Sequence, residues 1–347
     1  MWDEFVEQTV NLNHAKEVQA IRTFLLPFDL SFDDSKVDYT VALYHKDNLV
    51  ATGSLSGCVL RNIAINESLQ GEGLTGKIVT HLLNVAAQRG YYHTFLFTKP
   101  KNVQFFTQLG FVLLSQVKHA ALLETGLPSI SHYQQELRNQ TASLPSGQRA
   151  VLVMNCNPFT KGHQALIEKA ARENDAAVVL VVSEDQSAFP FAVRYRLVQL
   201  GTKHLANVKV LPSGSYTVSQ ATFPGYFTHG MDTIIAQTEL DATLFAQHIA
   251  SVLGASVRYL GEEPYSPTTQ AYNEALLRIL PKYGVKVKII PRVAVQEEVI
   301  SASKVRDLLS SQSIESVEPF VPVATYEFLQ STEAQPIIEN IKKNQAK

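Results

Sequence analysis

The second half of the chain alternates short apolar runs with amphipathic segments. Residues 177–182, Ala-Val-Val-Leu-Val-Val, are apolar throughout, as expected for a strand covered on both faces. This alternation predicts a doubly wound, Rossmann-like parallel sheet, which binds ligands beyond the carboxyl ends of its strands. Strands are predicted at 150–154, 177–183, 207–211, 256–260 and 285–290. Helices are predicted at 162–173, 191–203, 232–253, 269–280, 302–310 and 322–330. The polar C-terminal residues 334–347 are expected to fray.

The first half has a different rhythm. Strand-like runs at 39–44 and 49–55 are divided by the turn His-Lys-Asp-Asn, which is typical of a hairpin. A strand at 58–65 then leads through a glycine-rich loop into a long amphipathic helix that ends near Arg89. The remaining predicted elements are a helix at 15–26, a strand at 92–98, a helix at 102–109 and a strand that begins at Phe111. This mixture of hairpin and crossover predicts a largely antiparallel α+β domain.

A polar, turn-rich stretch separates the halves. Residues 138–148 contain Asn, Gln, Thr, Ser, Pro and Gly in place of a periodic pattern, which is typical of a surface linker. The chain has 347 residues, enough for two domains that each bury a core. We therefore predict an α+β domain at 1–138, a linker at 139–148 and a parallel-sheet domain at 149–347.

Composition and charge narrow the possible functions. Hydrophobic residues make up 45% of the chain and charged residues 18%, which is ordinary for a globular protein. The net charge of −2 argues against a nucleic-acid partner, since it provides no overall cationic field. The only cysteines, Cys58 and Cys156, are too few for a disulfide framework. Without a signal-peptide pattern or a membrane-length apolar run, we expect a cytoplasmic protein that does not contact membranes.

The most informative segment is Asn155-Cys-Asn-Pro-Phe-Thr-Lys-Gly-His163, between a predicted strand and a predicted helix. It places Gly162 and His163 at a helix N-terminus, where free amides and the helix dipole favour phosphate. Gly162 allows close approach of the backbone to a ligand. His163 adds a donor that can carry charge near neutral pH, and Lys161 can steer a polyphosphate.

A second segment, Ile300-Ser-Ala-Ser-Lys-Val-Arg306, begins another predicted helix. Ser301 and Ser303 can cap that helix and donate to pyrophosphate, while Arg306 can grip phosphate in a bidentate way. Each segment alone fits simple helix capping, but the two together on an α/β alternation indicate one nucleotidyl-transfer site. The catalytic residues would be His163, Lys161 and Arg306. The expected ATP contacts are Asn157, Pro158, Phe159, Thr160, Gly162, Gly261, Glu262, Ser301 and Ser303.

Other polar residues near the predicted strand ends leave alternatives open. Glu262 follows the fourth strand and either meets ribose or adenine or lies in a solvated loop. Ser183-Glu-Asp185 either shapes an acceptor pocket and helps to hold Mg²⁺ or caps a helix. We expect at least one of Arg194 and Arg196 to face the phosphates. The histidines at 204, 229 and 248 lack metal-ligand spacing, so no protein metal site is predicted.

The first half contains a second phosphate-binding pattern. The loop Gln70-Gly-Glu-Gly-Leu-Thr-Gly76 lies between a predicted strand and helix, and Phe105-Phe-Thr-Gln-Leu-Gly-Phe111 follows later. Together they resemble the acyl-CoA-dependent N-acetyltransferase (GNAT) superfamily, whose phosphate loop would here comprise Gln70, Gly71, Gly73, Thr75 and Gly76. That superfamily commonly has a general-acid tyrosine where this chain has Phe106. A phenyl ring cannot donate a proton, which favours pantetheine binding over acetyl transfer.

The second half resembles the cytidylyltransferase-like nucleotidyltransferases through Thr160–His163 and Ile300–Arg306. The order of the two domains resembles the citrate lyase ligase family. Segments 183–191, 219–227 and 261–264 have the same family character. The resemblance implies that acetate attacks ATP, with Mg²⁺, to give acetyl-adenylate and pyrophosphate. The acetyl group would then pass to the thiol of the phosphoribosyl-dephospho-CoA arm on the citrate lyase acyl carrier subunit.

Three alternatives remain open. The chain could be an adenylyltransferase for a phosphorylated small-molecule acceptor, an acetyltransferase that uses acetyl-CoA, or a non-catalytic nucleotide or CoA sensor. We also predict a division of labour in which the Gln70–Gly76 loop cradles the CoA-like arm. Tethering the arm would raise the effective concentration of its thiol near the second domain.

Overall fold

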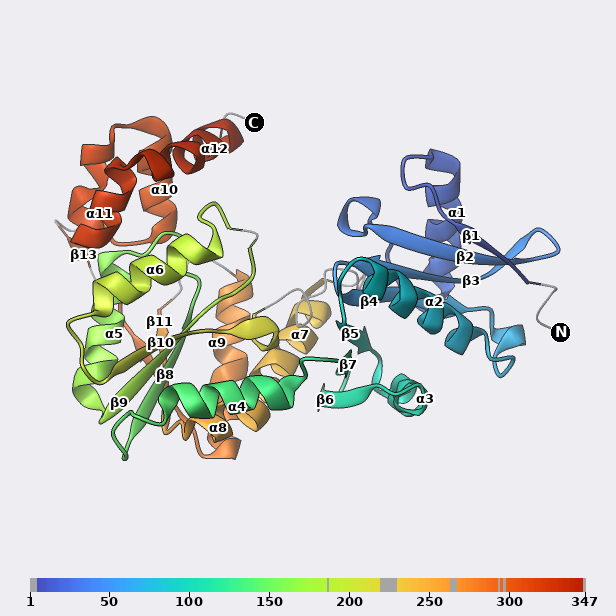
Figure 1. Cartoon of the computed structure of the whole chain (residues 1–347), viewed down its shortest axis with the longest axis horizontal. Helices are drawn as coiled ribbons and strands as arrows, with labels where there is room; N and C mark the ends of the chain where they lie inside the picture. Colours follow the sequence, from blue (N-terminus) through green and yellow to red (C-terminus); the bar gives the residue numbers. More distant parts are fainter. Residues whose placement is uncertain are drawn as a thin grey trace. The chain divides into compact units, whose positions relative to one another are not determined.

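The computed structural model describes residues 5–185, 187–218, 230–262, 267–292, 294–295 and 298–345. The chain forms two compact units (Figure 1). The first unit comprises residues 1–132 and 220–243, and the second comprises residues 133–219 and 244–347. In the part of the chain that is described, no helix is long and apolar enough to cross a membrane.

The first unit is built on a seven-stranded sheet in the order β1-β2-β3-β4-β5-β7-β6. Its elements are β1 (Phe5–Thr9), α1 (Ala15–Leu25), β2 (Tyr39–His45), β3 (Asn48–Ser56), β4 (Val59–Ile65), α2 (Leu74–Gln88), β5 (His93–Thr98), α3 (Val103–Gln108), β6 (Val112–Gln116) and β7 (Ala121–Gly126). Every neighbouring pair is antiparallel except β4 with β5. The predicted α+β fold is therefore confirmed, although the prediction missed β1 and β7.

Strands β4 and β5 pair only over a short stretch. Among the described residues, the parallel register joins Val59 to Phe95 and Leu60 to Leu96. Farther along β4, Asn62 has a φ of 53° and the register with β3 shifts. The two strands therefore diverge toward the carboxyl end of β4. Helix α2, which follows that end, packs tightly on the sheet, since a Cβ added at Gly53 would lie 2.6 Å from Ile78 Cγ2.

The second unit contains a five-stranded parallel sheet in the order β10-β9-β8-β11-β12. Its strands are β8 (Arg149–Met154), β9 (Ala176–Val181), β10 (Val208–Pro212), β11 (Val257–Gly261) and β12 (Lys286–Ile290). Its connecting helices are α5 (Lys161–Glu173), α6 (Phe191–Thr202), α8 (Ser251–Leu253) and α9 (Pro267–Ile279). Each predicted strand overlaps an observed one, and β9 is buried along its whole length, as its sequence predicts.

The strand order reverses between β8 and β11. These two strands pair through Ala150 with Val257 and through Val151 with Arg258, near their amino ends. No other residues of β8 and β11 pair among the described residues, so the two strands separate toward their carboxyl ends. A reversal of this kind makes the crevice in which open α/β sheets bind ligands. The loop at 155–160, which leaves β8, begins at this crevice.

The C-terminal segment forms helices where fraying was expected, so that prediction was wrong. The elements that follow β12 are β13 (Ala294–Val295), β14 (Glu298–Val299), α10 (Ala302–Ser311), a 3₁₀ helix (Ile314–Phe320), α11 (Val323–Gln330) and α12 (Gln335–Gln345). Ile337, Ile338 and Ile341 of α12 are buried in the same core cluster as Ile167 of α5. Burial of this apolar face outweighs the polar composition of α12.

Two further helices differ from the prediction. Helix α4 (Ile130–Thr141) runs through the predicted domain end at 138 into the predicted linker, because Leu137 and Thr141 are buried. The predicted helix at 232–253 consists of α7 (Gly230–Leu244), a π-helical segment (Phe245–Ala250) and α8. Of the polar residues that suggested a linker, 138–140 lie on the exposed face of α4, whereas 142–148 follow the helix.

Candidate functional site

The two sequence segments of the second unit meet at the carboxyl edge of the sheet. Arg306 Nη1, on α10, donates to the carbonyl oxygen of Asn157 at 2.5 Å. A Cβ added at Gly162, in the first turn of α5, would lie 3.5 Å from both Cγ2 and the carbonyl oxygen of Ile300. The start of α5 is therefore in contact with the segment that begins α10. The structure thus brings together the two halves of the predicted site.

A reciprocal cap orients His163. Its backbone N–H donates to Thr160 Oγ1 at 3.4 Å, while the backbone N–H of Thr160 donates to His163 Nδ1 at 3.1 Å. Because Nδ1 accepts a hydrogen bond from an amide, a neutral imidazole must carry its proton on Nε2. The cap therefore leaves His163 with an Nε2–H donor.

The expectation that His163 carries charge near neutral pH is corrected by its surroundings. Its ring is only partly exposed and stacks on Phe159, with centroids 6.0 Å apart and an interplanar angle of 13°. Burial and, to a smaller extent, the positive charge of Arg292 lower the pKa of His163 to about 4. Burial disfavours the charged form of an imidazole, so His163 is a neutral donor at pH 7.

Phe159 supports this arrangement from inside the core. The Phe159 side chain is fully buried, so its ring is not available to stack on a nucleotide base. A Cβ added at Gly201 of α6 would lie 2.4 Å from Phe159 Cε1, so a glycine there makes room for the ring. The carbonyl of Phe159 accepts a hydrogen bond from Thr325 of α11 at 3.0 Å. The neighbouring Pro158 is buried as well.

Lys161 binds the protein's own backbone. Its Nζ donates to the carbonyl oxygens of Glu318 at 3.1 Å and of Pro319 at 2.9 Å. These carbonyls lie near the end of the 3₁₀ helix, where main-chain acceptors have no partner within the helix. In this structure Lys161 therefore ties the start of α5 to the C-terminal helices, and the catalytic role expected for it stays a prediction.

The serines of the second segment cap α10 and hold Arg306. Ser301 Oγ accepts from the backbone N–H of Lys304 at 3.1 Å, which makes Ser301 the N-cap. Ser303 Oγ accepts from Arg306 Nη2 at 3.1 Å. Arg306 is partly buried, and this burial lowers the pKa of its guanidinium. Hydrogen bonds at both ends of the guanidinium thus fix its plane beside the 155–160 loop.

The loop after β12 adds a cation, Arg292, that the sequence reasoning missed. Glu262 donates its backbone N–H to the carbonyl of Ile290 at 2.9 Å and accepts from Arg292 Nε at 2.8 Å. A Cβ added at Gly261 would lie 4.0 Å from Leu166 Cδ2 of α5. Gly261 and Glu262 therefore lie at the same sheet edge as His163. An arginine two positions after the last predicted strand was the available signal.

Two arginines expected near the phosphates have structural roles instead. Arg194 is fully buried. It donates to the backbone carbonyls of Asn155, Val182, Glu184 and Phe189. Arg196 pairs with Glu333 at 2.7 Å. The prediction that one of them faces the phosphates was wrong, because the carbonyls of two loops need a buried donor and Arg194 supplies it.

The polar residues after β9 cap and brace their neighbours. Asp185 Oδ1 accepts from the backbone N–H of Phe191 at 2.7 Å, and Ser183 Oγ accepts from that of Gly214 at 3.0 Å. These contacts favour the capping interpretation. Among the residues that the structure describes, no group of three or more His, Cys, Asp or Glu side chains can hold a metal ion. The predicted segment 219–227 and Glu263 and His229 lie outside the described residues.

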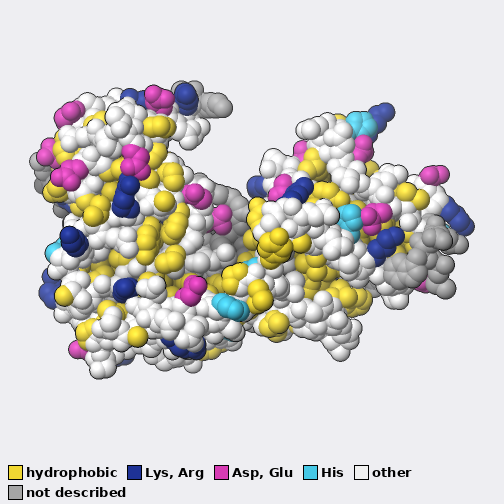
Figure 2. Space-filling model, in the orientation of Figure 1, with side chains coloured by type: hydrophobic (Ala, Val, Ile, Leu, Met, Phe, Trp, Pro, Cys, Tyr) yellow, Lys and Arg dark blue, Asp and Glu magenta, His cyan; other side chains and the backbone are white. Residues whose placement is uncertain are grey.

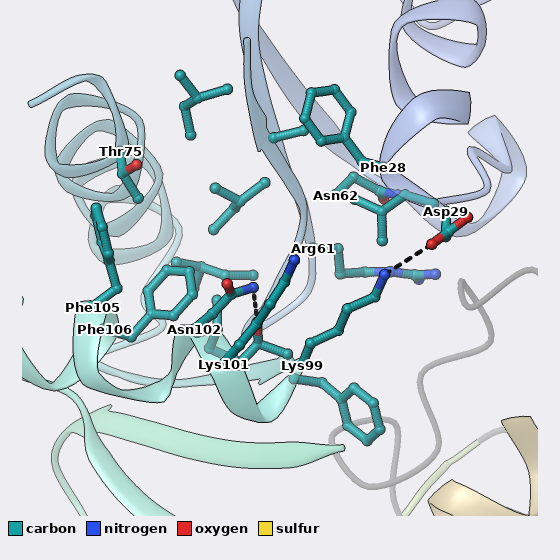
Figure 3. Close-up of a pocket in the computed structure, with 18 of the residues that line it drawn as sticks. Phe28, Asp29, Arg61, Asn62, Thr75, Lys99, Lys101, Asn102, Phe105 and Phe106 are labelled. Carbon is teal, nitrogen blue, oxygen red and sulfur yellow. Dashed lines mark hydrogen bonds and ion pairs between the residues drawn. The ribbon is translucent and has the colours of Figure 1, made fainter. Parts of the chain in front are cut away.

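The first unit has a cavity of about 280 Å³ where β4 and β5 diverge (Figure 3). Gln70 and Thr75 line it, and so do Lys99, Lys101 and Phe106. In Figure 3, Thr75 lies on one side of the pocket, and Lys99, paired with Asp29 at 3.1 Å, lies on the other. The predicted phosphate loop therefore opens into a pocket with room for a ligand.

The loop at the entrance to this cavity depends on glycine. Gly71 has a φ of 96° and Gly73, the N-cap of α2, has a φ of 75°. Side chains rarely adopt these angles, and the turn they make leaves the first amides of α2 at the loop. Phe106 is buried and its ring meets that of Phe111 edge to face, with centroids 6.1 Å apart. Phe106 therefore provides an apolar wall.

Charged side chains are dispersed over the face of the second unit that Figure 2 shows. Lysine and arginine side chains lie among acidic and apolar ones and do not form a stripe on that face.

Comparison with known proteins agrees with both units. Residues 149–329 match the model of the citrate lyase ligase C-terminal domain, and residues 8–111 match that of the acetyltransferase (GNAT) family. The chain is 34% identical over 329 residues to the [citrate [pro-3S]-lyase] ligase of Escherichia coli K12, which covers 93% of each chain. It is 34% identical over 317 residues to the corresponding protein of Klebsiella pneumoniae, covering 90% of this chain and 92% of the relative.

Proposed function

Because the chain belongs to the citrate lyase ligase family, we propose that it activates citrate lyase by acetylating the thiol arm of the acyl carrier subunit, at the expense of ATP. The observation that carries the proposal is the hydrogen bond between Arg306 and the carbonyl of Asn157. It joins two segments with phosphate-binding chemistry at the crevice of a parallel sheet.

The first step forms acetyl-adenylate. A carboxylate oxygen of acetate attacks the α-phosphorus of ATP, the bond to the β-phosphate oxygen breaks, and pyrophosphate leaves. His163 would donate its Nε2–H to a phosphate oxygen, and the backbone N–H of Gly162 would add the field of the α5 N-terminus. Arg306 would stabilise the charge that develops on the leaving pyrophosphate. Gly261 and Glu262 would border the ribose or adenine.

The residues around this centre would act by positioning it. Phe159 and Pro158 would hold the His163 ring from inside the core, and Thr160 would fix its tautomer.

Asn157 would keep the loop against α6 and α10, because its side chain accepts from the Phe189 N–H at 3.0 Å while its carbonyl binds Arg306. Ser301 and Ser303 would orient α10 and Arg306. Lys161 would hold the C-terminal helices beside the site.

Magnesium would arrive with the triphosphate. Mg²⁺ usually keeps several waters and binds through substrate phosphates and one or two carboxylates, so a dedicated protein cage is not required. Its chemistry would be to offset phosphate charge and help orient the triphosphate. Glu262, an exposed residue after β11, would offer a carboxylate to the metal ion.

The second step transfers the acetyl group to the carrier. The arm's thiolate sulfur attacks the acetyl carbonyl, the bond to AMP breaks, and a thioester forms. We propose that the first unit holds the CoA-like arm, with its pyrophosphate at the Gln70–Gly76 loop and its pantetheine in the β4–β5 cavity. Gln70 and Thr75 line that cavity, which supports this placement. Phe106 offers no hydroxyl, so the unit would bind the arm without performing acid catalysis.

An ATP–pyrophosphate exchange assay across short carboxylic acids tests the first step. Exchange that depends on acetate is expected, and addition of thiol-form citrate lyase should yield AMP and acetylated carrier. Exchange only with a phosphorylated acceptor would instead support the adenylyltransferase alternative. Binding of ATP without turnover under all these conditions would contradict both activities and favour a sensor.

A further inference from the structure

The buried guanidinium of Arg194 has no acidic partner in the part of the chain that is described. No carboxylate there lies within ion-pair distance of it. Asp185, on the loop after β9, accepts from the backbone N–H of Phe191 instead. Backbone carbonyls solvate Arg194 but leave its net charge in place. Because the interior screens a charge weakly, this arrangement favours an anion at the nearby surface.

The side chain of Asn155 extends this charge to the surface. Its Oδ1 accepts from Arg194 Nη1 at 3.0 Å. A guanidinium can only donate, so the amide oxygen must face Arg194 and the Nδ2 group must face away from it. Nδ2 donates one of its two hydrogens to Ser187 Oγ at 3.1 Å, and the other has no partner among the described residues. Asn155 is exposed, so this polarised N–H is available to a ligand.

Ser187 provides a second donor beside that amide. Its hydroxyl donates to Asn155 Oδ1 at 3.2 Å, and this hydrogen can rotate toward a ligand because Ser187 is partly exposed. The two residues lie in the loops after β8 and β9. Two positions farther along the first loop, the carbonyl of Asn157 binds Arg306 of α10. The donor pair therefore lies at the start of the loop that carries the proposed adenylation centre.

We propose that Asn155 and Ser187 bind the carboxylate of acetate during adenylation, with the charge of Arg194 behind them. The inference rests on the proposed function and names the residues that hold its smaller substrate. One carboxylate oxygen accepts from Nδ2–H and Oγ–H. The other oxygen attacks the α-phosphorus, and pyrophosphate leaves with the electrons of the broken P–O bond. Neither the sequence segments nor the family resemblance assigned a role to these two residues.

The size of the donor set distinguishes acetate from the triphosphate. Two donors backed by a single buried positive charge match a monoanion that carries its charge on two oxygens. A triphosphate carries several charges, and its proposed donors lie on α5 and α10, at His163 and Arg306. The acetate and ATP contacts therefore come from different side chains, so substitutions can separate them.

The direct test is ATP–pyrophosphate exchange in Asn155→Asp, with acetate and ATP varied separately. Aspartate has the same shape and can still accept from Arg194, so the loop keeps this anchor. It replaces the Nδ2 donor by a negative charge. The KM for acetate should rise by about 10–100-fold, as expected when a hydrogen bond to a charged group is lost. The KM for ATP should stay within about twofold of the wild-type value.

Two outcomes of this measurement would overturn the inference. An unchanged KM for acetate would show that the amide does not contact the carboxylate. An equal rise in the KM for ATP would assign the donor pair to the triphosphate. If Asn155→Asp does not fold, Ser187→Ala provides the same comparison of the two KM values.

Ser187→Ala and Ser183→Ala form a matched pair on the loop after β9. Ser187→Ala removes one donor and should raise the KM for acetate by about 2–10-fold. Ser183 Oγ accepts from the backbone N–H of Gly214 at 3.0 Å, so that hydroxyl is engaged toward the loop after β10. Ser183→Ala should therefore leave the KM for acetate at the wild-type value. Equal rises in both variants would indicate a general loosening of the loop and would contradict the proposed contact.

Acetate binding can also be measured without turnover. Saturation-transfer NMR of the acetate methyl group would use the full-length protein with an ATP analogue whose α–β bridge is a methylene. The signal should be present in the wild type and in Ser183→Ala and should be lost in Asn155→Asp. A signal of equal size in Asn155→Asp would refute the inference. If the wild type shows no acetate-dependent exchange, the proposed function fails, and this comparison still decides whether a small carboxylate binds at Asn155.

Discussion

The two units place their openings at the same kind of position but build them differently. In the first unit, β4 and β5 diverge after two paired residues and leave a cavity of about 280 Å³ lined by side chains. In the second, β8 and β11 also diverge after two pairs, and the loop and helix starts beyond them bind each other. The opening of the first unit is a cavity. In the second unit, the donors at the opening are hydrogen-bonded to the protein's own loops and helix starts.

This difference predicts how strongly an amino-acid substitution at each opening should reduce activity. A side-chain-lined cavity can lose one functional group and still bind a ligand, which fits the phenylalanine at position 106. In the second unit, Arg306 and Lys161 bind backbone carbonyls, and Thr160 and His163 bind each other. A substitution there removes a donor and also frees the loop that it holds. We therefore expect sharper losses of activity in the second unit.

The largest expected effect is on adenylation. Arg306→Ala and His163→Ala should each lower acetate-dependent exchange by about 10²–10³-fold, as loss of one preorganised donor commonly does. Binding of CoA to the first unit, measured by calorimetry, should be unchanged. Arg196→Ala is the control, since Arg196 is an exposed arginine that pairs with Glu333. Wild-type exchange in both variants would remove the contrast between the units.

The second effect is on stability. Gly201→Ala should destabilise the second unit by about 1–3 kcal/mol, because the new methyl would overlap the Phe159 ring at 2.4 Å. The comparison is Gly76→Ala, another helical glycine, where the methyl would meet Leu109 at an ordinary 3.6 Å. Thermal unfolding followed by circular dichroism should show a loss only for the first variant. Equal melting temperatures would mean that Phe159 is less confined than its burial indicates.

A smaller effect is expected at the phosphate loop of the first unit. Gly73→Val forces a branched side chain to a φ of 75°, which costs about 1–2 kcal/mol. CoA binding and acetylation of the carrier should each weaken about tenfold as a result. Exchange should remain at the wild-type level, and Glu72→Gln, in the same loop, should behave as wild type. Equal loss of exchange and transfer in Gly73→Val would contradict a separate arm-binding unit.

The smallest effect concerns pH. The pKa of His163 is about 4 in the folded protein, below its ordinary value of 6.5. Between these values the unfolded chain binds more protons, so the contribution of His163 to stability is present above pH 6.5 and is lost as the pH falls toward 4. Urea midpoints should fall more steeply across this window in the wild type than in His163→Gln. Parallel curves would refute the lowered pKa.

Local patterns predicted much of the fold and the candidate site. Apolar strands such as β9 and the helix starts at Thr160 and Ser301 depend on residues close in sequence, so the alternating pattern was sufficient to find them. The spacing of the apolar residues in the sequence also indicated the buried faces of α4 and α12. Leu137 and Thr141 are four positions apart, and Ile337 and Ile341 have the same spacing.

The remaining features depend on contacts that no local pattern contains. Lys161 is held by carbonyls that lie more than 150 positions later, so its orientation is not visible in the Thr-Lys-Gly-His segment. The neutrality of His163 depends on burial and on Arg292, which belongs to a different strand connection. Arg194 resembled a phosphate ligand until its carbonyl partners were known.

The bond from Thr325 to Phe159 has a consequence for biosynthesis. A nascent chain folds from its N-terminus as it leaves the ribosome, so the seven-stranded sheet of the first unit, which ends at Gly126, can form early. The 155–163 loop, however, must wait for residues 300–325 to emerge before its anchors exist. Fragments released by termination before Ile300 would therefore retain that sheet but lack the anchors of the 155–163 loop.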